Sequence, residues 1–191
     1  MKDIVVKNIK KSYGGKEVLK SFSAVFPAGC RVCVMGESGS GKTTLLRLIT
    51  GLEKPDEGSI TGVPERVSVV FQEDRLCEDF SIISNIRMVL DKEQDISDAQ
   101  IDSLLRDMGM TEPLDTPVRL LSGGMKRRVA IARALVYDSE LLIMDEPFKG
   151  LDETTKDRVI QAVKKRREAV LMVSHDLQEA KKMEAEIFNI K

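Results

Sequence analysis

Residues 30–50 read CRVCVMGESGSGKTTLLRLIT, an apolar strand pattern, a glycine-rich loop and a helix pattern in direct succession. The loop, GESGSGKT at residues 36–43, fits the phosphate-loop pattern G-x-x-x-x-G-K-[S/T] at every constrained position. Glycines let such a loop curl so that successive backbone N–H groups point at phosphate oxygens, and the following helix directs its positive end at the same anion. The stretch therefore predicts a site for a nucleoside triphosphate.

Two side chains of this loop have specific expected roles. Lys42 supplies a positive charge near the β- and γ-phosphates, and the Thr43 hydroxyl can ligate Mg²⁺. The alternative is a glycine-rich surface turn, but the strand before the loop and the helix after it are the context that the motif requires. The residues expected around the phosphates are Gly36, Glu37, Ser38, Gly39, Ser40, Gly41, Lys42, Thr43 and Thr44.

Length and composition fit one globular domain over residues 1–191, with 42% apolar residues. The net charge of -1 creates no field toward polyanions, so we expect no nucleic-acid partner. Residues 1–13 lack the apolar core of a signal peptide, and no apolar run approaches the length of a membrane span. These features predict a cytoplasmic protein, unless a partner holds it at a membrane.

The cysteine pattern argues against redox or metal chemistry. The chain has 3 cysteines, an odd number, which favours a reducing compartment over a disulfide framework. Cys30 and Cys33 form a C-x-x-C pair, but residues three apart on a strand point to opposite faces. We therefore interpret them as structural cysteines.

Strand and helix patterns alternate along most of the chain. They predict an α/β fold: a P-loop NTPase core with a mostly parallel sheet, an N-terminal antiparallel β subdomain and a small helical insertion at about residues 73–119. A surface turn is expected at 53–58. Strands are expected at 3–9, 18–26, 30–35, 67–71, 141–144, 169–174 and 187–190, and helices at 42–50, 125–137, 153–167 and 176–184.

Two acids follow the buried strand pattern at 141–144. Asp145 would hold Mg²⁺ at the carboxyl edge of the sheet, and Glu146 can polarise the water that attacks the γ-phosphate. Alone, the pair would equally fit a solvated strand end; the phosphate loop in the same chain favours the functional interpretation.

Gln72 and His175 also follow predicted strands. The Gln72 amide can reach the metal or the water, although an isolated glutamine is more often an exposed loop residue. His175 is the chain's only histidine, and at this sheet edge it can donate a hydrogen bond to the γ-phosphate.

A second glycine-rich helix start lies at residues 122–125. Ser122 is a plausible N-cap, and Gly123 and Gly124 expose backbone amides, so the segment can bind an anion. It is either an ordinary capped helix or, because one nucleotide already has its phosphates wrapped by the first loop, an element that completes the site of another copy.

These motifs, in this order, resemble the ATP-binding subunit of an ABC (ATP-binding cassette) transporter, and the resemblance covers nearly the whole chain. Residues 36–43 are similar to the Walker A loop, residues 141–146 to the Walker B strand with its catalytic glutamate, and residues 121–125 to the LSGGQ signature. Gln72 matches the Q-loop and His175 the switch histidine.

Further matches extend the resemblance. Tyr13 matches the aromatic residue that stacks on adenine, and residues 151–152 match the end of the D-loop. Residues 175–180, HDLQEA, and 71–76, FQEDRL, resemble importer subunits. Met125 stands where glutamine is usual, but the serine and glycines implied to contact phosphate remain, so we expect activity. Lys149-Gly150 stands where Ser-Ala is common, which puts the contact between subunits in question.

The resemblance implies a mechanism and partners. Two copies would sandwich two ATP molecules head to tail, each ATP lying between the Walker A loop of one copy and Ser122, Gly123 and Gly124 of the other. Catalysis would fall to Glu146, His175 and Gln72, and Mg²⁺ to Thr43, Gln72 and Asp145. Permease subunits on the inner face of the cell membrane, and a solute-binding protein, are the implied partners.

Two alternatives stay open beside transport. One is a soluble ABC ATPase. Such proteins commonly carry two cassettes in one chain or a long coiled-coil insertion, and this sequence has neither pattern. The other is a nucleotide-binding module without turnover, which the presence of Glu146 and His175 disfavours. Since one strand pattern follows His175, we also expect no C-terminal regulatory domain.

Overall fold

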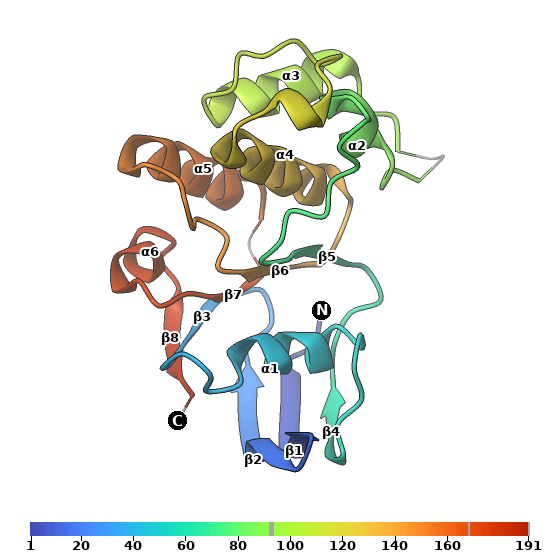
Figure 1. Cartoon of the computed structure of the whole chain (residues 1–191). Coiled ribbons are helices and arrows are strands. Elements are labelled where there is room, and N and C mark those ends of the chain that lie inside the picture. Colours follow the sequence, from blue (N-terminus) through green and yellow to red (C-terminus); the bar gives the residue numbers. More distant parts are fainter. Residues whose placement is uncertain (92–93, 168, 191) are drawn as a thin grey trace.

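A computed structural model gives the fold and describes residues 1–91, 94–167 and 169–190 (Figure 1). The elements in chain order are β1 Ile4–Tyr13, β2 Lys16–Phe26, β3 Arg31–Met35, α1 Lys42–Ile49, β4 Glu57–Thr61, β5 Val67–Val70, α2 Ile82–Arg87, α3 Asp98–Asp107, the 3₁₀ turn Val118–Leu120, α4 Gly123–Val136, β6 Leu141–Asp145, α5 Glu153–Arg166, β7 Val170–Val173, α6 Leu177–Lys182 and β8 Glu186–Asn189.

The strands form two sheets. One has the order β5-β6-β7-β3-β8, with every neighbouring pair parallel; the other has the order β2-β1-β4 and is antiparallel. Figure 1 shows α1 between the antiparallel sheet and the parallel sheet, with α4 and α5 on the opposite face of the parallel sheet. The predicted α/β class, with its parallel core and antiparallel N-terminal part, is confirmed.

The central strands β3, β6 and β7 of the parallel sheet are buried on both faces, which explains their continuous apolar sequences. Along β6, Leu141 and Ile143 pack in the cluster that contains α1, whereas Leu142 and Met144 pack in the cluster that contains α4 and α5. All five residues of β6 are buried. Because side chains alternate along a strand, this burial fixes the register and brings Asp145 to the carboxyl edge.

The helical insertion is less helical than the sequence suggests. Within the predicted insertion the described residues contain α2, α3 and a 3₁₀ turn, joined by irregular segments. The apolar stripe on α3, including Ile101 and Leu105, is buried in the same cluster as Leu142 and Met144 of β6. The insertion therefore shares its core with the sheet.

The sequence interpretation missed one strand. β4 occupies part of the turn predicted at 53–58 and pairs antiparallel with β1, with Ile60 opposite Val6. Its side chains are mostly exposed, so the sequence has no apolar alternation; backbone pairing with β1 determines this edge strand. In the described part of the chain, no helix is long and apolar enough to cross a membrane.

The cysteines lie as the strand pattern predicts. Cys33 is fully buried in the cluster below α4, whereas Cys30 packs against the cluster on the α1 side. Both are free thiols, and burial raises the pKa of Cys33 to about 12. Their sulfurs face different layers, as a structural role requires.

Candidate functional site

A cleft of about 590 Å³ lies where the phosphate loop meets the carboxyl ends of the central strands. It brings together residues from β1 and β2, the loop after β3, α1, and the segments that follow β5, β6 and β7. The lining residues are Tyr13, Lys16, Val18, Gly36, Ser38, Gly39, Gly41, Lys42, Thr43, Thr44, Gln72, Asp145, Glu146, Lys149, Val173 and His175. Of the expected phosphate-loop residues, Glu37 and Ser40 are outside this lining.

Two glycines of the loop are required by their surroundings. A Cβ on Gly36 would lie 2.6 Å from the Ile190 carbonyl oxygen. Gly41 has φ 91, and a Cβ there would lie 2.8 Å from Leu19 Cδ2. The chain can therefore make this tight turn into α1 only with glycine at these positions.

The start of α1 is open to an anion. Gly41 provides no side-chain cap, so the first-turn N–H groups of α1 have no side-chain acceptor. Lys42 is largely buried, and its Nζ donates to the carbonyl oxygens of Gly36 and Glu37 at 2.8 and 2.7 Å. A phosphate oxygen is a stronger acceptor than these carbonyls, so the ammonium group is placed to exchange them for a charged partner.

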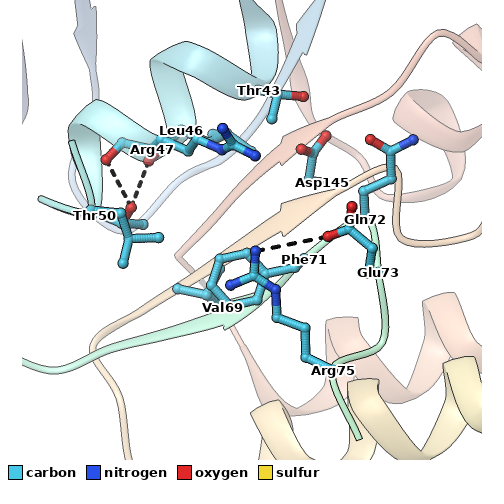
Figure 2. Close-up of a pocket in the computed structure, with 11 residues that line it drawn as sticks. Thr43, Leu46, Arg47, Thr50, Val69, Phe71, Gln72, Glu73, Arg75 and Asp145 are labelled. Atoms are coloured by element: carbon cyan, nitrogen blue, oxygen red, sulfur yellow. Dashed lines mark hydrogen bonds and ion pairs between the residues drawn. The ribbon is translucent and has the colours of Figure 1, made fainter.

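Oxygen atoms that could bind a metal gather beside the first turn of α1. Asp145 is 6% exposed, and its Oδ1 has no hydrogen-bond partner among the described residues. Burial raises its pKa, and the nearby Thr43 side chain acts in the opposite direction. Figure 2 shows Thr43, Asp145 and Gln72 facing one another from α1, the end of β6 and the segment after β5.

This donor set fits Mg²⁺. Carboxylate, hydroxyl and amide oxygens are hard ligands, and Mg²⁺ usually completes its shell with waters and substrate phosphates. Among the described residues no group of three or more His, Cys, Asp or Glu side chains could hold a metal without such help. The unpartnered oxygen of Asp145 is therefore the main feature that points to a cation here.

Glu146 and His175 form a pair in the cleft. The Glu146 carboxylate Oε2 lies 2.9 Å from His175 Nδ1, and the side chains are 16% and 71% exposed. Glu146 has φ 46, a left-handed conformation that is costly for a residue other than glycine. Its N–H donates to the Val173 carbonyl at 3.0 Å, which ties the strained residue to β7.

Tyr13 stands at the end of β1 and lines the same cleft. Its hydroxyl donates to the Glu53 carboxylate, and Lys11 Nζ lies 5.5 Å from the ring centroid. The half-exposed ring is thus held at the cleft's edge, where it offers an apolar face.

The signature segment lies elsewhere. Ser122 caps α4: its Oγ accepts a hydrogen bond from Met125 N, and its own N–H donates to Met125 Sδ, both at 3.4 Å. Ser122, Gly123 and Gly124 are absent from the cleft lining, so within one chain the structure does not bring them to the phosphate loop.

The sequence interpretation did not single out two residues near this site. Lys16 lines the cleft from the start of β2. Arg127 is buried below the strand ends, and the polar run KRR at 126–128 gave no sign of this. A charge that is buried by backbone acceptors from distant segments leaves no local pattern in the sequence.

Comparison with known proteins identifies the family. A family model described as ABC transporter matches residues 19–149. The aliphatic sulfonates import ATP-binding protein SsuB 1 of Nocardia farcinica is 40% identical over 181 residues, which cover 93% of this chain and 73% of that protein. The protein of the same name from Paracoccus denitrificans is 37% identical over 184 residues, covering 93% and 74%.

Solved structures agree with these relatives. The dimeric structure of a bacterial ABC transporter cassette matches with a TM-score of 0.86 at 27% identity, over 98% of this chain and 94% of that chain. A post-hydrolysis state of that cassette, bound to ADP and Pi, matches with a TM-score of 0.85 at 27% identity over the same shares of 98% and 94%. A bacterial Atm1-family ABC exporter with ATP bound matches with a TM-score of 0.85 and 26% identity over 100% of this chain and 37% of that chain.

Proposed function

Because the chain belongs to the ABC transporter family, as an ATP-binding and ATP-hydrolysing subunit, we propose that it powers solute import at the inner face of the cell membrane. The observation that supports ATP turnover is the Glu146–His175 pair, 2.9 Å apart, in one cleft with the phosphate loop, and the direction of transport follows the relatives named for import. A module that only bound nucleotide would not need a carboxylate and an imidazole at this edge.

Binding of ATP would use the donors around α1. The first-turn N–H groups and Lys42 would hold the β- and γ-phosphates, and the Tyr13 ring would stack on the adenine. Thr43, Gln72 and Asp145 would hold Mg²⁺, which neutralises phosphate charge when bound.

Hydrolysis would use the pair at the ends of β6 and β7. Glu146 would accept a proton from water as the water oxygen forms a bond to the γ-phosphorus, and the bond from that phosphorus to the β–γ bridging oxygen would break, releasing ADP and phosphate. The His175 imidazole lies within hydrogen-bond distance of the Glu146 carboxylate and can orient it. His175 would donate a hydrogen bond to the γ-phosphate oxygens as charge develops.

Dimerisation would complete the site. The start of α4 is exposed and glycine-rich but lies outside the chain's own cleft, as expected for a segment that contacts ATP held by a second copy. A two-fold axis would then create two equivalent sites. Opening after hydrolysis would return the permease to its resting state.

The permease would dock beside the helical insertion. A groove of about 510 Å³ lies between β5, the end of α4 and the segment after α2, and its lining of apolar and polar residues includes Phe71, Val89 and Tyr137. Gln72 follows Phe71 directly, so a partner in this groove would sense the nucleotide cleft. A solute-binding protein would deliver the solute. The relatives named for import of aliphatic sulfonates make such compounds the first solutes to screen.

Copurification tests the transport proposal. The chain is expressed with the membrane protein encoded beside it, solubilised in mild detergent and assayed for ATPase activity. A stoichiometric complex with stimulated hydrolysis supports the proposal. An active soluble dimer that retains no membrane protein would instead indicate a soluble ABC ATPase.

A trapped dimer tests the catalytic assignment. Glu146→Gln removes the base and keeps the shape, so we expect kcat to fall about 10²–10⁴-fold while ATP binding persists. Gel filtration with ATP should then show a dimer. If this variant stayed monomeric with ATP, the sandwich model would be wrong.

A further inference from the structure

Arg127 is a buried, charged side chain that contacts the backbone of residues lining the nucleotide cleft. It lies on α4, five positions after Ser122, and its side chain is 5% exposed. Burial of a cation is costly unless its donors are satisfied. Asp74 is the carboxylate it meets, with Nη1 to Oδ1 at 3.1 Å, and that acid is itself partly exposed. The remaining partners are backbone carbonyl oxygens.

These carbonyls belong to two segments that the sheet brings together. Nε donates to Pro147 O at 2.7 Å, and Nη2 donates to Asp145 O and Glu146 O at 3.0 and 2.9 Å. Nη1 donates to Phe71 O at 2.5 Å and approaches Gln72 O at 3.4 Å. One guanidinium group thus bridges the segment that carries Gln72 and the segment that carries Glu146.

The hydrogen bond from Arg127 to the Glu146 carbonyl helps to hold Glu146 in its left-handed conformation. A non-glycine residue at φ 46 keeps that conformation only where its surroundings hold it. Glu146 is held on one side by its N–H bond to Val173 O and on the other by Arg127, which binds its carbonyl. The direction of the Glu146 carboxylate toward His175 therefore depends on a residue of α4.

From this geometry, and resting on the proposed function, we propose that Arg127 is a positioning residue for hydrolysis. It holds the backbone of Glu146 and of the Gln72 segment in one arrangement, and it links both to the helix whose start meets the partner's nucleotide. A rigid fork with five N–H donors can do this; a lysine, with three donors at one point, cannot reach both segments with the same geometry.

The chain offers two matched controls on the same helix. Arg128, the next residue, donates to Gly124 O, Met108 O and Gly109 O and so binds the helical insertion. Arg133 donates to Asp74 O and Arg75 O, which places it on the Gln72 segment but not on the Glu146 segment. Replacing each by lysine removes a buried or half-buried guanidinium group without touching Glu146.

The test compares Arg127→Lys, Arg128→Lys and Arg133→Lys in steady-state ATP hydrolysis and in ATP binding. Because a misplacement of about 1 Å at a reacting group can cost about 10²-fold, we expect Arg127→Lys to lower kcat at least about tenfold. Its ATP affinity should stay within about twofold, because the phosphate loop is untouched. Arg128→Lys should keep kcat within about threefold, and Arg133→Lys, which affects the Gln72 segment alone, should lose clearly less than Arg127→Lys.

A double-mutant cycle separates positioning from general damage. If Arg127 acts through Glu146, then Arg127→Lys should change the single-turnover rate less than about twofold in a Glu146→Gln background. Multiplicative losses, or equal kcat losses in all three lysine variants, would overturn the proposal. Should Arg127→Lys fail to give a cooperative melt, Arg127→Gln is carried through the same cycle and judged by the same criterion. A wild-type chain without ATPase activity would contradict the proposed function instead.

Discussion

Two helices of this chain begin at a glycine-rich segment, and they treat their first-turn N–H groups in opposite ways. α1 starts after Gly41, which is left-handed and caps nothing, and its open donors face the chain's own cleft. α4 starts after Ser122, whose side chain caps the helix, and it lies outside that cleft. The same sequence signal, glycines before a helix, thus accompanies open donors in the chain's own cleft at α1 and a capped start outside that cleft at α4.

The largest loss of ATP affinity is expected from a substitution at the start of α1. Lys42→Ala removes a charge-assisted partner of the phosphates, a loss of about 3 kcal/mol or about a hundredfold in ATP affinity. Calorimetric titration with ATP measures it. Lys16→Ala, which removes a lysine from the rim of the same cleft, is the control and should cost a few-fold at most. Unchanged affinity in Lys42→Ala would contradict the assignment of α1 as the nucleotide site.

The next effect concerns the α4 side. Ser122→Ala should lower kcat about tenfold at saturating ATP, because a hydrogen bond to the partner's nucleotide, worth about 1.5 kcal/mol, is lost. ATP affinity of the dilute monomer should not change. Ser97→Ala is the matched control, since Ser97 caps α3 by the same kind of box and its loss costs a similar ~1 kcal/mol of stability.

Mixing the Lys42→Ala and Ser122→Ala variants tests whether the two helix starts act on one nucleotide. In a head-to-tail dimer of Lys42→Ala with Ser122→Ala, one site carries both changes and the other carries neither. The mixture should therefore recover activity that neither variant shows alone. If mixing restores nothing, the two helix starts serve separate sites within each chain.

The two helix starts also show which features of the structure can be predicted from the sequence. The phosphate loop and the strand before Asp145 were predictable because their patterns are local: glycines for positive φ, a continuous apolar run, and an acid at its end. The carboxyl-edge rule also predicts that Lys42 and Glu146 lie at the same sheet edge, and both line one cleft in the structure.

What the sequence did not show depends on long-range contacts. β4 is held by pairing with β1, not by its own pattern, and so was predicted as a turn. The insertion was predicted as mostly helical because its apolar spacing is helical, yet much of it is irregular chain that packs through residues such as Met110 and Leu114. Arg127 is buried by carbonyls from two strand ends, which no local spacing encodes.

A smaller effect tests the metal donors next to α1. Burial raises the pKa of Asp145, so the folded state binds its proton more tightly than the unfolded state. Stability is therefore unaffected by this group at a pH below its ordinary value, and falls as pH rises from that value through the raised pKa. The ionised carboxylate is therefore unfavourable in the folded chain, and a bound cation would relieve it.

Asp145→Asn should therefore raise the melting temperature of the chain without ligands by roughly 2–4 °C, for about 1 kcal/mol. It should also abolish most of the added stabilisation by ATP with Mg²⁺. Asp56→Asn is the opposite control, because hydrogen bonds from Ser12 and Lys11 lower the pKa of Asp56 and favour its charged form. A lower melting temperature for Asp145→Asn would show that its carboxylate stabilises the chain without a cation.

The smallest effect concerns Met125, where the two helix starts can be compared without disturbing either site. Its sulfur is a weak acceptor, 3.4 Å from Ser122 N, at the position where a glutamine amide oxygen would complete a stronger capping box. Met125→Gln should stabilise the chain by about 0.5 kcal/mol, a rise in melting temperature of roughly 1–2 °C. Differential scanning calorimetry measures this.

The same variant tests which chain α4 serves. Tightening the α4 cap should leave ATP affinity of the dilute monomer unchanged, because Ser122 lies outside the cleft that holds Lys42. It should change only the protein concentration at which ATP produces a dimer. A change in the ATP affinity of the monomer would mean that α4 reaches the nucleotide of its own chain. Both helix starts would then contact the same nucleotide.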